Sequence, residues 1–524
     1  MPSLERTAYP RFGRVITALE LERSYTPTDE EIAWMRSMVR TANHRLCLAV
    51  SLKCFQRLHH FPELESVPET VINHLRQCLQ MNQAVEVRYD RPNTMYRHRQ
   101  LIRDWLEVQP YHDNIKARRI AASAALRASA VLDDPVDIVN AMIEELQRES
   151  IELPAYSTLD RFAGRAHAAA DRRLFRRTMR HISGEQRQAL DQLLTVDFER
   201  SFSAFQTLKV SAKKATLSHL EELLSHLEWL ESLGNIDAVL AEVPPAKRRA
   251  FANEAKALDA SELKDYSDAQ RCTLILCMIH RSRVRTRDEI TEMFLRRMAT
   301  IHKRAKDELH QIHLEQRERT ERLVETLDSL LTVLSSQEDD HAAAAKMRTL
   351  VGEKAEIEAL RNDCAAIRAW SNNNYLPLLW RHYRSHRQVL LKVLRSLRLE
   401  ASTADDRLLN AVAVILDNAA RRPRYLEPDE IDLAFASDRW KKLVLQQVEG
   451  EIRVDRRQLE VCVFSYLMAE LRSGDITVWG TESFADYRDQ LLPMEQCRSL
   501  FRSYCEGLEL PKTASEFVAI SRAF

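Results

Sequence analysis

The sequence predicts an all-α protein built from several small helical bundles in series. Its 524 residues include only 9 glycines and 16 prolines, while Leu, Ala, Glu and Arg are abundant. These four residue types favour helices, and tight hairpins usually need glycine. Hydrophobic residues make up 45% of the chain, which is enough for packed cores. The strand-like exception is the segment Ile476-Thr477-Val478-Trp479, which predicts a minor β element near the C-terminus.

The first hundred residues predict a bundle of four helices. The segment Thr26-Pro27-Thr28-Asp29-Glu30-Glu31 combines a threonine cap, an early proline and acidic residues at the positive end of a helix. Apolar residues then recur at helical spacing over 43–60, 67–80 and 94–108. The fourth helix is a candidate DNA-binding element, because polar and basic residues lie opposite its apolar side. This first candidate set is Arg88, Arg91, Arg97, Arg99, Gln100 and Arg103.

A second candidate element follows Pro135. One helix is expected from Pro135 to about Leu146, and Leu153-Pro154-Ala155 should end it. Ser157 is expected to cap the next helix, with Asp160 completing a capping box. Winding this helix places Leu159, Phe162, Ala163, Ala166 and Ala170 on one face.

The opposite face of that helix is basic. This arrangement suits a helix that lies on DNA. Its apolar side would pack on its own domain, while its guanidinium side would contact phosphates and guanine edges. The alternative is a solvated surface helix held by salt bridges, for which Asp171 is the main acidic partner. This second candidate set is Thr158, Arg161, Arg165, Arg172, Arg173, Arg176, Arg177 and Arg180.

The remainder of the chain also predicts helices. An aromatic stripe that includes Phe198, Phe202 and Phe205 is interpreted as core, and a very long charged helix is expected over 287–335. In it, Leu309, Leu327 and Leu334 belong to an imperfect heptad pattern that is broken at Gln316. Self-association and packing within one chain both fit this pattern. Further helices are expected over 183–194, 216–233, 342–369, 376–399, 405–418 and 428–435.

Charge and cysteine content limit the class of protein. Lys+Arg 77 against Asp+Glu 77 gives a formal net charge of +0, so any nucleic-acid surface must come from local segregation of charge. The 9 cysteines are scattered in apolar helices, which suits reduced thiols. No apolar run reaches the roughly 20 residues of a membrane span. We therefore expect a cytoplasmic, nucleoid-associated protein without a membrane partner.

The order of these features resembles the N-terminal region of the Tn-three family of replicative transposases. The resemblance rests on the Thr26–Glu31 segment, Asn43-His44-Arg45-Leu46, Val67-Pro68, the run from Tyr89 to His98, and Gly474-Asp475-Ile476. It implies helical domains that recognise terminal inverted repeats, followed by an RNase H-like domain with a D-D-E metal site. It assigns no individual base contact. That catalytic domain would begin after Gly474, so the chain is expected to lack it and not to be an enzyme alone.

The sequence itself contains no evident catalytic constellation. Cys47 and Cys54, with His44, His59 and His60 nearby, make zinc conceivable, but the compact spacing of a structural zinc site is absent. We interpret these thiols as buried core and expect no metal and no cofactor.

These observations predict a DNA-recognition and assembly region. Double-stranded DNA at transposon ends is the expected partner, together with a second copy or a full-length transposase. A helical scaffold without specific DNA binding and one half of a split enzyme are the alternatives. The expected segments are two DNA-binding domains at 1–115 and 116–200, a helical domain with the long helix at 201–336, a helical linker at 337–450, and a helix with a short strand at 451–524.

Overall fold

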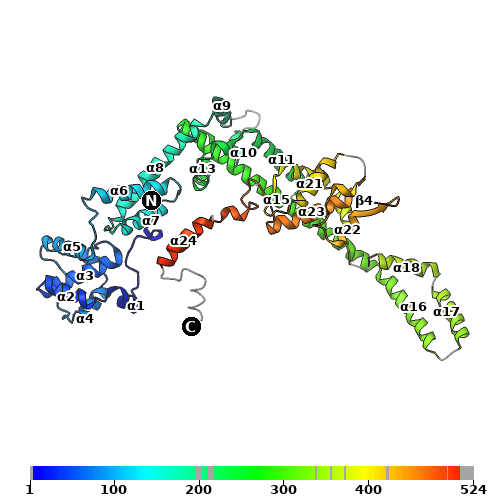
Figure 1. Ribbon diagram of the computed structural model, residues 1–524, viewed down its shortest axis with the longest axis horizontal. Helices are drawn as coiled ribbons and strands as arrows, with labels where there is room; N and C mark the ends of the chain where they lie inside the picture. Colours follow the sequence, from blue (N-terminus) through cyan, green and yellow to red (C-terminus); the bar gives the residue numbers. More distant parts are fainter. Residues whose placement is uncertain are drawn as a thin grey trace. The chain divides into compact units, whose positions relative to one another are not determined.

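The fold is that of a computed structural model, which describes residues 4–195, 203–209, 216–336, 339–354, 357–370, 373–420, 424–492 and 494–507. The chain divides into two compact units. Unit 1 comprises residues 1–209 and 235–280, and unit 2 comprises residues 210–234 and 281–524. Both units are mainly helical, as predicted (Figure 1). The finer division into five segments stays a prediction.

The first core of unit 1 surrounds α3 (Ala42–Leu58), whose apolar residues are almost all buried. The preceding helix α2 (Asp29–Met38) starts with a capping box, in which Thr28 and Glu31 each accept a hydrogen bond from the other's backbone amide. The predicted helix start is therefore confirmed. The helices that complete this core are α4 (Glu69–Cys78) and α5 (Pro92–Leu106).

The second core of unit 1 is a bundle of three helices, α6 (Ile115–Ser129), α7 (Pro135–Arg148) and α8 (Tyr156–Arg180). Alanines line the inner face of α6, so its neighbours can pack closely against it. Helix α7 begins as predicted, because the Asp134 carboxylate accepts a hydrogen bond from the Val136 amide. Three residues of the predicted apolar face of α8, Leu159, Ala163 and Ala166, are buried.

The predicted cap of α8 is wrong. The helix begins at Tyr156, its N-cap is Ala155 and no side chain caps it, so Ser157 lies inside the first turn. Leu153 and Pro154 are buried. Because they anchor the chain directly before the helix, the helix starts as soon as the proline is passed.

Unit 1 is completed by short helices and by the first part of a long one. The predicted core role of the aromatic stripe is confirmed at Phe205, which is fully buried, while Phe198 and Phe202 lie outside the described residues. The remaining elements are η1 (Leu4–Arg6), α1 (Ala18–Glu20), η2 (Leu21–Tyr25), η3 (Leu64–Ser66), α9 (Gly184–Gln192), α10 (Ala204–Thr207), α12 (Ile236–Val239), α13 (Pro245–Ala257) and α14 (Ala260–Lys264).

The long helix is α15 (Asp268–Glu315), and the boundary between the two units falls within it. It starts earlier than predicted, and it ends where the heptad pattern breaks, at Gln316. There α16 (Arg317–Ser335) begins and packs against α17 (Asp340–Lys354) and α18 (Ile357–Trp370). The single helix predicted over 342–369 is thus two helices, and residues 355–356 between them lie outside the described part of the chain.

The core of unit 2 joins the second part of α15 to helices from both ends of the unit. Two other predicted helices are wrong. The helix predicted over 376–399 is three shorter pieces, and only Pro428–Glu430 of the helix predicted over 428–435 is helical. The helices of this core are α11 (Leu217–Ser232), η4 (Leu376–Leu378), α19 (Leu379–Tyr383), α20 (Arg387–Ser396), α21 (Arg407–Asn418), η5 (Pro428–Glu430), α22 (Asp438–Val444) and α23 (Arg456–Ser473). They are followed by η6 (Tyr487–Gln490) and α24 (Met494–Gly507).

Unit 2 also holds two small antiparallel sheets. In the first, β1 (Leu399–Ala401) pairs with β5 (Ile476–Val478), which confirms the predicted strand. In the second, β4 (Glu451–Asp455) lies between β2 (Tyr425–Leu426) and β3 (Leu445–Val448). No strand of this second sheet was predicted from the sequence. None of the described helices is long and apolar enough to cross a membrane.

Candidate nucleic-acid interface

The basic face of α8 is exposed along the whole helix. Its two ends differ in their surroundings, since Arg161 and Arg165 lie beside half-buried Thr158, whereas the later arginines together line one surface recess. The exposed residues are Arg161, Arg165, Arg172, Arg173, Arg176, Arg177 and Arg180.

Most of these arginines have no acidic partner among the described residues. Among the described residues, an acidic side chain lies within ion-pairing distance of Arg177 only, whose Nε is 2.6 Å from a carboxylate oxygen of Glu242. Asp171, the main acidic partner that the salt-bridged alternative would need, does not pair with these arginines. Six guanidinium groups of one helix therefore face solvent without a neutralising carboxylate in the described part of the chain.

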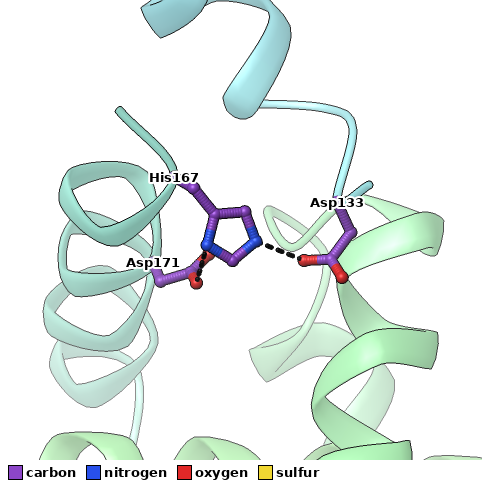
Figure 2. A group of neighbouring side chains, drawn as sticks. All are labelled: Asp133, His167 and Asp171. Carbon is purple, nitrogen blue, oxygen red and sulfur yellow. Dashed lines mark hydrogen bonds and ion pairs between the residues drawn. The ribbon is translucent and has the colours of Figure 1, made fainter. Parts of the chain in front are cut away.

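Asp171 instead belongs to a partly buried ion cluster on the inward side of α8 (Figure 2). Lys247, on α13, is fully buried, and its Nζ lies 2.7 Å from Asp171 and 2.8 Å from Asp133. His167 lies between the same two carboxylates, at 3.0 Å from Asp133 and 3.2 Å from Asp171. This cluster fastens the inward face of α8 to α13 and to the loop before α7, which leaves the arginine face turned outward.

The cluster also has the spacing of a metal site. Ligand atoms of Asp133, His167 and Asp171 lie within 4.8 Å of one another. The Lys247 ammonium, however, already contacts both carboxylates and supplies the positive charge that a cation would bring. The arrangement therefore suits a structural ion cluster. Sequence reasoning missed it, although His167 and Asp171 at i and i+4 on one helix were a signal.

Protonation of His167 depends on this cluster. The hydrogen bond to Asp133 raises the pKa of His167 above its ordinary 6.5, against the opposing effect of burial, and Asp171 adds to the increase. Burial alone would raise the pKa of Asp133, but hydrogen bonds from His167 and Lys247 leave it below 3.8. Both shifts stabilise an imidazolium between two carboxylates.

We therefore expect a pH-dependent stability difference between the native chain and His167→Gln. The raised pKa means that the stabilisation by His167 is complete below the unfolded pKa and is lost as the pH rises through the folded pKa. Denaturant unfolding should thus show a larger native advantage at about pH 5.5 than at about pH 9. An equal advantage at both values would contradict the assignment of a charged His167.

The candidate residues on and before α5 divide into two groups. Arg88, Arg91, Arg97 and Gln100 are exposed, and Gln100 donates a hydrogen bond to Asp104. Arg99 and Arg103 are half-buried with their guanidinium groups over the ring of Phe61.

Arg103 also has a close acidic partner. Its guanidinium pairs with Glu152 at 2.8 Å, and its side chain is only 17% exposed. This contact ties α5 to the segment before α8, so Arg103 has a structural task that its place in the sequence did not reveal.

The thiols near the conceivable zinc position are buried in the first core. Burial raises the pKa of Cys47 to about 11 and that of Cys54 to about 12. Burial also lowers the pKa of the nearby His60 to about 4. Because zinc binds thiolates, protonated thiols fit the core interpretation better than a metal site.

Comparison with known proteins gives consistent matches. Residues 1–166 match a family described as a domain of unknown function, DUF4158. The chain is 24% identical over 503 residues to the transposase for transposon Tn501 of Pseudomonas aeruginosa, covering 95% of this chain and 50% of that protein. The chain is thus similar in sequence to about half of that transposase.

Two further relatives are also transposases. The transposase for transposon Tn2501 of Escherichia coli is 25% identical over 478 residues, and the transposase for transposon Tn1546 of Enterococcus faecium is 19% identical over 475. The chain spans about half the length of the curated relatives it matches. These matches fit the predicted resemblance to the N-terminal region of such an enzyme.

Proposed function

We propose that this transposase-like chain binds double-stranded DNA at the terminal inverted repeats of a transposon. The observation that carries the proposal is the row of six arginines on α8 without a described acidic partner. Exposed residues Arg88, Arg91 and Arg97 at α5 would form a second contact. In this proposal the chain recognises DNA, and strand cutting belongs to a D-D-E domain outside the described residues.

The charge distribution supports this role over general surface solvation. The chain has a formal net charge of +0, so attraction to phosphates must arise from a local surface. A surface helix stabilised by salt bridges would pair its arginines with nearby acids. Of the two acids on α8, Asp171 pairs with Lys247, and Asp160 forms no ion pair with a described arginine. The unpaired guanidinium groups can instead contact phosphates and guanine edges.

Selection of bound duplexes from a random DNA pool tests the proposal. We expect a recovered motif of inverted-repeat length, whose binding is lost when Arg161 and Arg165 are both changed to Ala. The matched control changes two exposed arginines of unit 2, Arg296 and Arg317, which pair with acids on their own helices. Weak binding without a recovered motif would contradict end recognition and favour the scaffold hypothesis.

A separate observation supports self-association. Val324, Leu327, Leu331 and Leu334 on α16 are all more than half exposed and alternate at spacings of three and four residues. Leu309, by contrast, is buried within the core of unit 2. The exposed stripe repeats the a and d positions of a coiled coil, so we propose that α16 pairs with α16 of a second copy.

Leu327→Glu with Leu331→Glu should therefore convert a dimer into a monomer in sedimentation experiments, because two charges would replace the centre of the apolar seam. Thr332→Glu, an exposed position beside the seam on the same helix, is the matched control and should stay dimeric. A native chain that sediments as a monomer throughout the micromolar range would contradict the pairing.

A further inference from the structure

Unit 1 contains a cavity of about 860 Å³ beside the start of α8. That volume is within the usual range of small-molecule sites. The N-terminal arm, the segment after α3, the start of α6 and the first turns of α8 form its walls. Five aromatic rings line it: Tyr9, Phe12, Phe61, Tyr111 and Phe162.

Arginines from three different segments also line this cavity. Arg11 comes from the arm, Arg118 from α6, and Arg161 and Arg165 from α8. Arg11 and Arg118 lie 3.9 and 3.7 Å from single carboxylates, Glu5 and Asp113. No described acid pairs with Arg161 or Arg165. The cavity thus combines apolar ring faces with a positively charged rim.

One carboxylate of the cavity wall would repel an anionic ligand if its charge were not balanced. Glu152 lines the cavity, but its charge is balanced by Arg103 at 2.8 Å. The net charge of the remaining described wall is therefore positive, and an anionic ligand is favoured.

Two residues of the cavity wall each carry a buried polar atom without a described hydrogen-bond partner. The Tyr111 hydroxyl and the His60 Nδ1 are buried, and neither has a hydrogen-bond partner among the described residues. Tyr111 is 8% exposed, and burial raises its pKa while Arg118 and Arg161 act against the increase. A buried hydroxyl without a partner is costly, so a ligand acceptor that reached it after a small shift of the Tyr111 side chain would gain a hydrogen bond.

We propose that this cavity takes one unpaired nucleotide of the DNA strand that lies along α8. The base would stack among the aromatic rings and meet the Tyr111 hydroxyl, and its phosphate would contact Arg161 and Arg165. Aromatic rings with arginines are the usual surroundings of an unstacked base. The proposal rests on the proposed DNA binding, because Arg161 and Arg165 belong to both surfaces.

Photo-cross-linking tests it with the full chain. DNA containing 5-iododeoxyuridine, which reacts with aromatic side chains under long-wavelength light, is bound and irradiated, and the modified peptides are mapped. We expect adducts on Tyr9, Phe12, Tyr111 or Phe162. Exposed Tyr487 of unit 2 is the background control.

The outcomes separate the two proposals. Bound DNA without adducts in the cavity would overturn this inference and leave the proposed function standing, whereas a chain that binds no DNA would overturn both. Loss of the adducts on adding thymidine monophosphate, with the DNA still bound, would mean that the free nucleotide and the base of the DNA occupy the same cavity, which would support the inference.

Two conservative variants sharpen the result. At saturating DNA, Phe162→Leu should lower the adduct yield about fivefold, because it removes a stacking face and keeps the packing apolar. Tyr111→Phe removes only the hydroxyl and should lower the yield about threefold, so the test survives if Phe162→Leu does not fold. Unchanged yields in both variants would overturn the inference.

Discussion

Changing Arg172, Arg173 and Arg176 together to alanine is expected to weaken DNA binding and to flatten its salt dependence. Each lost phosphate contact should reduce the slope of log affinity against log salt by about 0.9, so the three together should reduce it by about 2.7. The stability of the fold should change by less than about 0.5 kcal/mol per site, because no described acid pairs with these side chains. Affinity measured over a series of salt concentrations, with thermal unfolding in parallel, tests both parts.

A neighbouring residue of the same helix supplies the control. Arg177 pairs with Glu242 in unit 1, so Arg177→Ala should change the slope less than Arg176→Ala does. Equal slopes for the native chain and the triple variant would mean that phosphates do not lie along this part of α8.

The second large effect is expected from Lys247→Met. The change removes the buried ammonium from Asp133 and Asp171, which are only partly buried and keep their contacts with His167, so we expect a cost of about 1–3 kcal/mol. Hydrogen exchange of the backbone amides of α8 and α13 should reveal this loss of stability locally, because the two units need not unfold together. Lys256→Met, at an exposed position of the same helix, should cost less than about 0.5 kcal/mol.

A different result would revise the role of the cluster. If Lys247→Met is as stable as the native chain, the two carboxylates are solvated well enough to need no ammonium partner. Measuring zinc binding by the variant would then test whether Asp133, His167 and Asp171 bind a metal once the lysine is removed.

Local features were predictable because they depend on neighbouring residues. Asp134 and Pro135 determine where α7 begins, and the spacing of Leu159, Ala163 and Ala166 determines which face of α8 is buried. The exposure of the arginine face followed from the same spacing.

Contacts between distant segments were not predictable. Lys247 lies 114 residues from Asp133 and 76 from Asp171, and Arg103 lies 49 residues from Glu152. Periodicity describes one helix at a time, so it could not show that Asp171 would pair with a lysine of α13. It also could not show that residues of the N-terminal arm and α8 would enclose one cavity.

The division of tasks on α8 has a consequence for how such a protein can change over time. Its inward residues hold the helix in place, while its outward arginines carry no described structural contact apart from Arg177. Under the proposed function, a mutation on the outward face alters the DNA preference and leaves folding nearly untouched. A lineage can therefore follow a drifting inverted repeat by single substitutions, each passing through a well-folded intermediate.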